Sequence, residues 1–320
     1  MKDVLLLIGD FDTVPDGNYL RIANHLLEKG NQVSLGLTDQ LHLSNMTVKV
    51  PATRVEALMT AGQPSPPLRQ GTVRALNSFS LCWVLNLGLK ETFLDKMQLL
   101  YGISSPVINS VEALLHFKSK YALPGLVDQL NRGVTESESL KHPPSWASSD
   151  PEYLSDIVRQ TGGSWIIKPP AGSFGREVVH FQSTDPDVKK ILTRLSGEDR
   201  KAYVLMQQYI QAAAQGEKRV LLAAGRPIGQ YHRHNPLDHR NNVSLNPILS
   251  PCELTAREMD ACTRLGELLL SKGVYFTGID LVWPWLIEVN VVNPGGLTTI
   301  DELGEGNRVA DLVDPILLGL

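Results

Sequence analysis

The stretch that most constrains this chain lies near its C-terminus, where residues 275–296 read YFTGIDLVWPWLIEVNVVNPGG. Two apolar runs, 277–283 and 285–292, flank Pro284 and are rich in Ile, Val, Leu and Trp. Apolar runs of this length on either side of a turn residue are typical of the arms of a β-hairpin. The stretch therefore predicts a short hairpin in a mostly apolar sheet.

Three polar side chains interrupt the two apolar runs. Side chains alternate between the faces of a strand, so Glu288 and Asn290 point the same way, and Asp280 on the other arm can lie on that face too. Two carboxylates and an amide that converge on an apolar sheet are costly unless something satisfies them. A hard divalent cation would do so, since Mg²⁺ commonly binds carboxylates together with substrate phosphates. The alternative is an exposed strand face with ordinary solvated side chains.

Composition limits the classes of protein to which the chain can belong. Its 320 residues are 42% hydrophobic and 20% charged, which is ordinary for a globular protein and long enough for several domains. A net charge of −4 gives no basic signature for nucleic acid or a membrane surface, and no apolar run approaches the roughly 20 residues that span a bilayer. The scattered cysteines Cys82, Cys252 and Cys262 fit neither a disulfide framework nor a zinc site and favour a reducing cytosol.

The first half of the chain reads as an α/β unit. The pattern predicts strands at 3–8, 32–37, 81–87 and 106–108, and helices at 17–29, 91–101 and 111–123. The β-α-β opening favours a parallel sheet covered by helices. Asn109 and Ser110 can cap the last of these helices.

The second half reads as an α+β unit that is rich in hairpins. A stretch of weak order at 131–150 separates it from the first half. The expected elements are helices at 151–161 and 255–272, and strands at 164–168, 177–182, 203–209, 218–224 and 227–231. A Gly-rich loop at 170–176 joins two of these strands.

Two of these segments have the composition of a phosphate and nucleotide site. In IIKPPAGSFGR, residues 166–176, Lys168 ends an apolar strand and a loop of small residues follows, which lets backbone N–H groups approach an anion. After the strand VLMQQYI, residues 204–210, the chain can offer an adenine edge one backbone donor and one acceptor, and Glu217 and Arg219 could reach ribose and phosphate. Ordinary hairpins are the alternative for both segments.

The polar segment 230–246 has no apolar stripe and contains three histidines. The spacing of His232 and His234 could suit a metal, but alternating residues on a solvated hairpin are commoner. A mobile lid that brings Arg233 and Arg240 to phosphates fits the composition better.

Taken in order, these pieces resemble the ATP-grasp superfamily, and most closely the bacterial glutathione synthetases. The resemblance runs over roughly 105–300 and is clearest at IIKPPAGSFG, MQQYI, GEKRVLLAAGRPI, FTGID and IEVNVVNP. It implies an ATP-grasp fold preceded by a Rossmann-like parallel-sheet domain. The expected domains are a substrate-binding domain at 1–117, a central nucleotide-binding domain at 118–200 and a C-terminal domain with lid and metal site at 201–320.

The resemblance also implies a role for each matching position. Lys120, in the helix after Asn109, and Lys168 match the two lysines that bind nucleotide phosphates, and Glu217 matches the acidic residue at the ribose. The implied nucleotide-binding residues are Lys120, Lys168, Gly172, Ser173, Phe174, Gly175, Gln207, Gln208, Tyr209, Ile210, Glu217 and Arg219. The implied catalytic residues are Arg219, Arg233 and Asn242, the Mg²⁺ ligands Asp280, Glu288 and Asn290, and the substrate-lining residues Asn293, Pro294, Gly295 and Gly296.

The implied activity is a carboxylate–amine ligase reaction. ATP phosphorylates a carboxylate to give an acyl phosphate, and an amine then attacks to give an amide. The resemblance implies ATP and Mg²⁺ as cofactors, with two ions and Mn²⁺ as an alternative metal, and cationic side chains that stabilise the transferring phosphoryl group. The expected enzyme is cytoplasmic, acts on small molecules without nucleic acid or membrane partners, and could form a homo-oligomer as related bacterial enzymes do.

Three departures from the family pattern bear on the substrates. The lid arginine should fall near 233–234, where Arg233 or His234 could take its place. The N-terminal domain has Asn86-Leu87-Gly88-Leu89-Lys90-Glu91 where an Arg-Lys-Asp-Pro-Pro-like run is expected, so Asp10, Asp12, Asn18 and Lys90 are the substrate candidates by position. Asn293-Pro294-Gly295-Gly296 replaces a Ser-Pro-Thr run, and its glycines leave more room for the acceptor. The first hypothesis is therefore glutathione synthetase or a close relative, the second a ligase for another amino acid or peptide pair, and the third a non-catalytic nucleotide-binding regulator.

Overall fold

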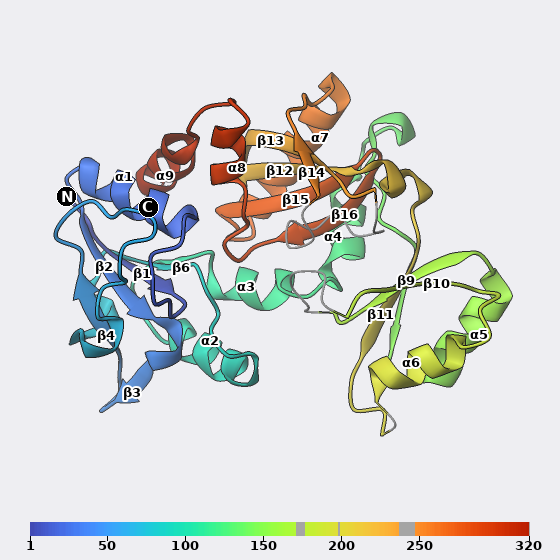
Figure 1. Cartoon of the computed structure of the whole chain (residues 1–320), viewed down its shortest axis with the longest axis horizontal. Coiled ribbons are helices and arrows are strands. Elements are labelled where there is room, and N and C mark those ends of the chain that lie inside the picture. Colours follow the sequence, from blue (N-terminus) through green and yellow to red (C-terminus); the bar gives the residue numbers. More distant parts are fainter. Residues whose placement is uncertain (171–176, 198, 237–246, 320) are drawn as a thin grey trace.

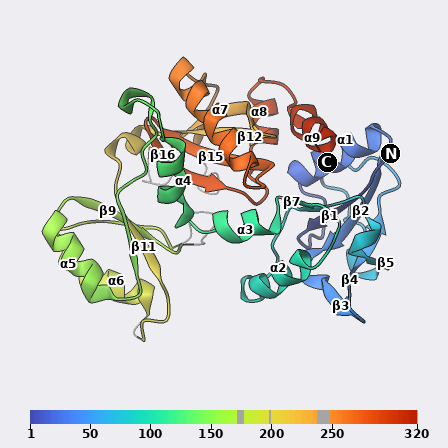
Figure 2. The same ribbon diagram turned by 180° about the vertical axis from the view of Figure 1, so that it is seen from behind.

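The computed structural model describes residues 1–170, 177–197, 199–236 and 247–319. These residues form three sheets with their helices (Figure 1). The N-terminal and C-terminal sheets lie next to each other, and a smaller central unit projects from one end of the molecule (Figure 1 and Figure 2). Within these ranges, no helix combines the length and apolarity needed to cross a membrane.

The N-terminal sheet has the order β3–β4–β2–β1–β6–β7, with β5 against β4. Its strands are β1 (Asp3–Ile8), β2 (Gln32–Leu37), β3 (His42–Ser44), β4 (Thr47–Arg54), β5 (Thr72–Ala75), β6 (Leu81–Val84) and β7 (Val107–Ile108). β1 pairs in parallel with both β2 and β6, which confirms the predicted β-α-β opening. Helix α1 (Asn18–Glu28) buries Ile22, Ala23 and Leu26, which recur at helical spacing, and α2 (Phe93–Tyr101) precedes β7.

The central unit is an antiparallel sheet with the order β10–β9–β11–β8. Its elements are β8 (Ser145–Ser148), α5 (Pro151–Thr161), β9 (Ser164–Lys168), β10 (Val179–Gln182), α6 (Val188–Ser196) and β11 (Val204–Gln208). It has its own hydrophobic core, in which Leu154, Trp165 and Leu192 are fully buried. β8 lies within 131–150, the stretch that was expected to be weakly ordered. A strand forms there because pairing with β11 overrides a Pro- and Ser-rich local sequence.

The C-terminal sheet has the antiparallel order β14–β13–β12–β15–β16. Its strands are β12 (Glu217–Ala223), β13 (Arg226–His234), β14 (Ile248–Ser250), β15 (Phe276–Val282) and β16 (Trp285–Asn290), accompanied by α7 (Ala256–Leu270), α8 (Leu297–Glu302) and α9 (Val309–Leu318). Thr255 begins α7 through a reciprocal capping box with Glu258. The hairpin predicted at 277–292 is confirmed as β15 and β16.

Two short helices, α3 (Val111–Phe117) and α4 (Ala122–Leu130), connect the N-terminal sheet to the rest of the molecule (Figure 1). The single helix expected over 111–123 is wrong, because the chain leaves the helix after Phe117 and starts a new one at Ala122. In the first turn of a helix a proline costs no intrahelical hydrogen bond, and the restart places Pro124 there. The break carries Lys120 out of the helical stack.

The N-terminal and C-terminal sheets share two apolar clusters. Buried side chains of α3 and α4 belong to the same cluster as Val220 of β12 and Leu265 of α7. The predicted combination of an α/β unit with an α+β unit is confirmed, whereas the domain boundaries at 117/118 and 200/201 stay a prediction. Helix α9 packs on α1, so the end of the described chain returns to the N-terminal sheet (Figure 1).

Candidate active site

The hairpin brings its three polar side chains to one face, as predicted. Asp280 of β15 and Glu288 of β16 are direct partners across the antiparallel pair. Asn290 Nδ2 lies 3.4 Å from Asp280 Oδ2, to which it donates. Two carboxylates and an amide oxygen are therefore available within a few residues, all of them hard oxygen donors. The described residues include no group of three or more His, Cys, Asp or Glu side chains that could hold a metal ion.

Two arginines hold the Asp280 carboxylate. Arg219, its neighbour across β12 and β15, donates from Nε to Oδ1 at 2.6 Å and from Nη2 to Oδ2 at 3.1 Å. Arg233 Nη2 donates to Oδ1 at 2.7 Å. Burial raises the pKa of Asp280, but the charges and hydrogen bonds of Arg219 and Arg233 outweigh it and hold the pKa below its usual value.

Glu217 is the second carboxylate on the arginines. Arg233 Nη2 donates to Glu217 Oε1 at 2.5 Å, and the two residues are partners across β12 and β13. Burial and the negative charge of Asp280 raise the pKa of Glu217 to about 7 against the pull of Arg233 and Arg219. Glu217 thus lies in the same charged cluster as Asp280, and its ribose role stays a prediction.

Arg233, rather than His234, reaches this cluster. Successive residues of β13 point to opposite faces, so His234 lies on the other side of the sheet from Arg233. Arg233 is 3% exposed, and its Nε has no hydrogen-bond partner among the described residues. A buried guanidinium N–H without a partner is costly, which fits a site that receives an acceptor from a ligand.

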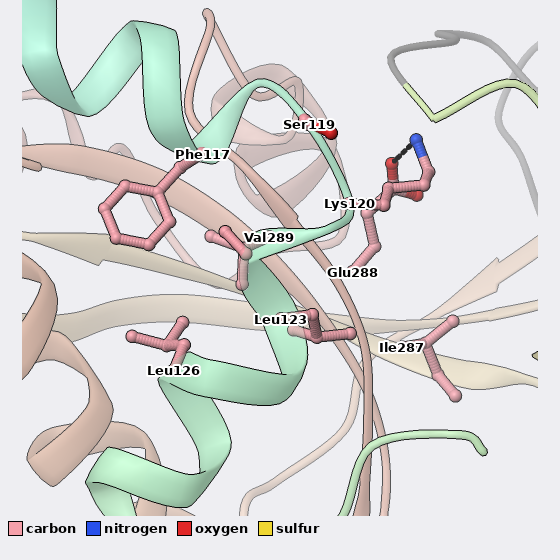
Figure 3. A pocket seen from close by; sticks show the side chains of 9 residues that line it. Phe117, Ser119, Lys120, Leu123, Leu126, Ile287, Glu288 and Val289 are labelled. Atoms are coloured by element: carbon pink, nitrogen blue, oxygen red, sulfur yellow. Dashed lines mark ion pairs between the residues drawn. The ribbon is translucent and has the colours of Figure 1, made fainter. Parts of the chain in front are cut away.

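Lys120 pairs with Glu288 from the break between α3 and α4. Lys120 Nζ lies 2.8 Å from Glu288 Oε1 (Figure 3), and the Lys120 backbone N–H donates to the Pro170 carbonyl at 2.9 Å. Burial raises the pKa of Glu288, but the charges of Lys120 and then Lys168 prevail and lower it. The pair lies at the rim of an apolar pocket lined by Phe117, Leu123, Leu126, Ile287 and Val289 (Figure 3).

Lys168 ends β9 on the central sheet and faces the same carboxylates. Its side chain is buried, with 8% of the residue exposed. Burial lowers the pKa of Lys168 to about 8, although the charges of Glu288, Glu217 and Asp280 act to raise it. The site therefore combines cations from the central unit, the α3–α4 break and the C-terminal sheet.

The predicted adenine hinge, Gln207 to Ile210, comprises the last two residues of β11 and the two that follow. Gln207 Nε2 donates to Ser145 Oγ at 2.8 Å, so its side chain is tied to β8. The backbone N–H groups of Gln208 and Tyr209 donate to the Pro144 and Ser164 carbonyls at 3.0 and 2.8 Å. The N–H groups of Gln208 and Tyr209 are thus already hydrogen-bonded within the protein. Ile210 ends the segment just before a short 3-10 turn.

The predicted substrate segment follows β16 closely. Arg219 Nη1 donates to the Gly295 carbonyl at 3.5 Å, so the arginine that holds Asp280 also contacts this segment. Pro294 packs where a Cβ on Gly278 would come within 2.8 Å of it, which explains the glycine at that position of β15. Gly296 has a φ of +146° and lies under Leu221 and Tyr231.

The remaining predicted residues are distributed differently. Gly172, Ser173, Phe174, Gly175, Asn242 and Arg240 lie outside the described residues. Asp10 pairs at the surface with Arg69, and Lys90 begins a short 3-10 turn.

Sequence reasoning missed the role of Asn109. Instead of capping α3, a task that Ser110 performs, its side chain accepts from the N–H groups of Tyr275 and Phe276 at 2.7 and 2.9 Å. It also donates to the carbonyls of Phe276 and Val291, both at 2.7 Å. The only sequence signal for Asn109 is its position directly after a strand and before a helix, and the local pattern there predicts a helix cap.

Comparison with known proteins agrees with this geometry. The sequence model of the family "Prokaryotic glutathione synthetase, ATP-grasp domain" matches residues 135–305, more than half of the chain. A glutathione synthetase of Thermosynechococcus vestitus is 29% identical over 260 residues, which are 78% of this chain and 76% of that protein. One from Nostoc sp. is 32% identical over 172 residues, 53% of this chain, so the chain spans about half (52%) of that relative's length.

A solved structure shares the fold over nearly the whole chain. The RimK domain ATP-grasp protein of Sphaerobacter thermophilus has a TM-score of 0.64 over 98% of this chain and 99% of that chain, at 17% identity. It confirms the predicted ATP-grasp fold, whereas the family match carries the closer relationship. The chain belongs to the family of prokaryotic glutathione synthetase ATP-grasp domains.

Proposed function

We propose that the chain is an ATP-dependent ligase that joins a carboxylate to an amine through an acyl phosphate, with γ-glutamylcysteine and glycine as the first substrates to test. The observation that carries the proposal is the single cluster in which Asp280, Glu288 and Glu217 meet Lys120, Lys168, Arg219 and Arg233. Such a cluster is costly to bury unless it binds an ionic ligand. A nucleotide triphosphate with its metal is an ionic ligand of the required kind.

A divalent cation fits the donors at the hairpin. Asp280, Glu288 and the amide oxygen of Asn290 would hold it, and Mg²⁺ prefers such oxygens over the nitrogens of a histidine site. We propose two Mg²⁺ ions, with Mn²⁺ as an alternative. When bound, such an ion would supply positive charge to phosphate oxygens and so ease transfer of the phosphoryl group.

The cations of the cluster would then change partners. Lys120 pairs with Glu288, and Arg219 and Arg233 pair with Asp280, in the protein alone. With these carboxylates engaged by a metal, the same side chains would be available to donate to the phosphates and to the oxyanion that forms as the amine attacks. The catalytic candidates are Arg219, Arg233 and the lid residue Asn242. The nucleotide would be held by Lys120, Lys168 and the glycine loop.

A second candidate is a ligase for another amino acid or peptide pair. The family match begins at residue 135, so the N-terminal substrate domain lies outside it. The exposed Gly295 also leaves open space beside the cluster, since a Cβ there would meet no atom within 4 Å. Both observations concern the substrates and leave the ATP chemistry unchanged.

The compartment follows the same proposal. All three cysteines are free thiols, two of them buried, as a reducing cytoplasm would leave them. We propose small molecules as the partners, in addition to copies of the chain in a homo-oligomer.

An ADP-release assay over a panel of amino acids and dipeptides tests the proposal. Release that depends on γ-glutamylcysteine and glycine together supports the first candidate. Release only with other pairs supports the second. ATP binding without release for any pair would refute the ligase and leave a non-catalytic nucleotide-binding regulator.

A further inference from the structure

The first helix of the N-terminal sheet contacts the segment that follows the metal-site hairpin. Asn18 opens α1 and is 6% exposed. Its Nδ2 donates to Asn293 Oδ1 at 3.0 Å and to the Pro294 carbonyl at 2.6 Å. Both N–H bonds of one buried amide thus serve a segment from the other end of the chain.

The same segment is also contacted by the active-site cluster. Arg219 Nη1 reaches the Gly295 carbonyl at 3.5 Å while its other nitrogens bind Asp280. Asn18 and Arg219 therefore fix successive residues of one short segment between the N-terminal and C-terminal sheets. The backbone there cannot shift without breaking hydrogen bonds on one side or the other.

A second side chain of α1 strengthens this contact. Arg21, on the same helix, donates from Nε to Thr298 Oγ1 at 3.1 Å and from Nη1 to Asp301 Oδ2 at 3.0 Å. Thr298 and Asp301 belong to α8, which begins directly after the segment. Helix α1 is consequently hydrogen-bonded both to the segment and to α8, which follows it.

Within the segment, Gly295 is the exposed residue between buried neighbours. Pro294 and Gly296 are buried on either side of it. A Cβ at Gly295 would meet no other atom within 4 Å, and the φ of Gly295 lies outside the left-handed region. Neither a close contact nor the backbone conformation therefore requires glycine here, and the space beside it is open. The position of this opening depends on the hydrogen bonds that hold Asn293 and Pro294.

We propose that Asn18 is a positioning residue for the amine substrate: by holding Asn293 and Pro294, it sets where the opening at Gly295 lies relative to Arg219 and Asp280. The inference rests on the proposed ligase function, because it assumes an amine that must reach an acyl phosphate beside the cluster. Asn18 acts through the segment and needs no contact with the nucleotide. Its loss should therefore change amine use while nucleotide binding stays the same.

The kinetic test compares Asn18→Ala and Asn18→Asp with wild type, using γ-glutamylcysteine with either glycine or L-alanine as the varied amine. Losing two hydrogen bonds should raise the KM for the amine by roughly tenfold or more, with the KM for ATP changed less than about twofold. Asn18→Asp keeps the shape but sets an acceptor against two acceptors, so its effect should equal or exceed that of Asn18→Ala.

Asn24 supplies a matched control on the same helix. Its amide also makes two hydrogen bonds, to the N–H and carbonyl of Met59, but Met59 lies in the loop after β4, far along the chain from the segment at Asn293. Asn24→Ala should leave the amine KM unchanged whatever it does to stability. An amine KM that rises equally in Asn24→Ala and Asn18→Ala, or an ATP KM that rises with it, would overturn the positioning role.

Hydrogen exchange gives a readout that needs no turnover. Backbone amides in 291–298 should exchange faster in Asn18→Asp than in wild type, and at the wild-type rate in Asn24→Ala. If wild type releases no ADP with any amine, the ligase function fails, and exchange alone decides whether Asn18 holds the segment. Equal exchange in Asn18→Asp and wild type would overturn the inference even in an active ligase.

Discussion

Two regions of this molecule are equally shielded from water but differ in what burial does for them. On one face of the N-terminal sheet, Leu5 and Leu7 of β1 are fully buried among other apolar side chains. On the C-terminal sheet, Asp280 and Arg233 are 4% and 3% exposed. Apolar burial stabilises the fold directly, whereas a buried ion pair at best offsets its own desolvation. The charged cluster is therefore better explained by what it binds than by stability.

The largest expected effect tests the metal end of the cluster. Glu288→Ala removes a carboxylate whose described ion-pair partner is Lys120. Phosphoryl transfer should fall at least about 1,000-fold, because several kcal/mol of charge stabilisation are lost. The side chain is 27% exposed, so the fold should persist by circular dichroism.

Glu136→Ala is the matched control, since Glu136 is 91% exposed and pairs only loosely with Lys141. ADP release by Glu288→Ala near the wild-type rate would show that Glu288 binds no essential metal.

The next effect distinguishes a buried charge network from a surface pair. Asp280→Ala leaves Arg219 and Arg233 buried without their shared partner, which should cost about 3–5 kcal/mol in the free energy of unfolding. Glu152→Ala removes a carboxylate that pairs with Lys189 where both side chains are more than half exposed, and should cost less than about 1 kcal/mol. Urea unfolding of both variants measures the difference. Equal costs would mean that the cluster is more hydrated than its burial indicates.

A smaller effect concerns the nucleotide. Lys168→Met keeps much of the apolar stem but removes the charge at the end of β9. Affinity for ADP with Mg²⁺ should fall about 10- to 100-fold, the value of a hydrogen bond to a charged group. Titration calorimetry measures it, with Lys190→Met as the control because Lys190 is 84% exposed. Unchanged affinity in Lys168→Met would exclude a phosphate contact.

The smallest effect is a dependence of stability on pH. The pKa of Lys168 is lowered from 10.5 to about 8 in the folded protein, first of all by burial. Below about pH 8 the lysine is charged in both states and the cost of burying the charge is fully present. Between about pH 8 and pH 10.5 the unfolded chain binds more protons than the folded protein, so the free energy of unfolding rises with pH.

Relative to Lys168→Met, wild type should therefore gain about 1 kcal/mol of stability between about pH 8 and pH 9. Urea unfolding midpoints measured across this range would give the difference. Parallel pH profiles for the two proteins would contradict the lowered pKa.

The sequence supports some of these features better than others. The hairpin of Asp280 and Glu288 follows from period-two alternation, which is a local signal, and so does the capped start of α7 at Thr255. The break that carries Lys120 was not predicted, since the 111–123 segment has helical periodicity and only the placement of Pro124 in a new first turn reveals it. β8 depends on β11, far along the chain, so no local pattern identifies it.

The contacts that join distant segments were the least predictable part of the site. Asn18 and Asn109 look like ordinary residues at the ends of elements, yet each amide binds backbone near the hairpin. The direction in which an amide side chain points depends on the tertiary structure. The choice between Arg233 and His234 likewise depends on the tertiary structure, because it is decided by which face of β13 is turned toward Asp280.

The four hydrogen bonds of Asn109 also affect how the molecule can move. They join the end of β7 to β15 and to the residue after β16, so the N-terminal and C-terminal sheets cannot separate without breaking a buried network. The central unit has its own core and is joined to the rest by few elements (Figure 1). If the chain binds a nucleotide as proposed, opening for its exchange would therefore be a swing of the central unit, which would carry Lys168 away from the paired carboxylates while the two larger sheets stay together.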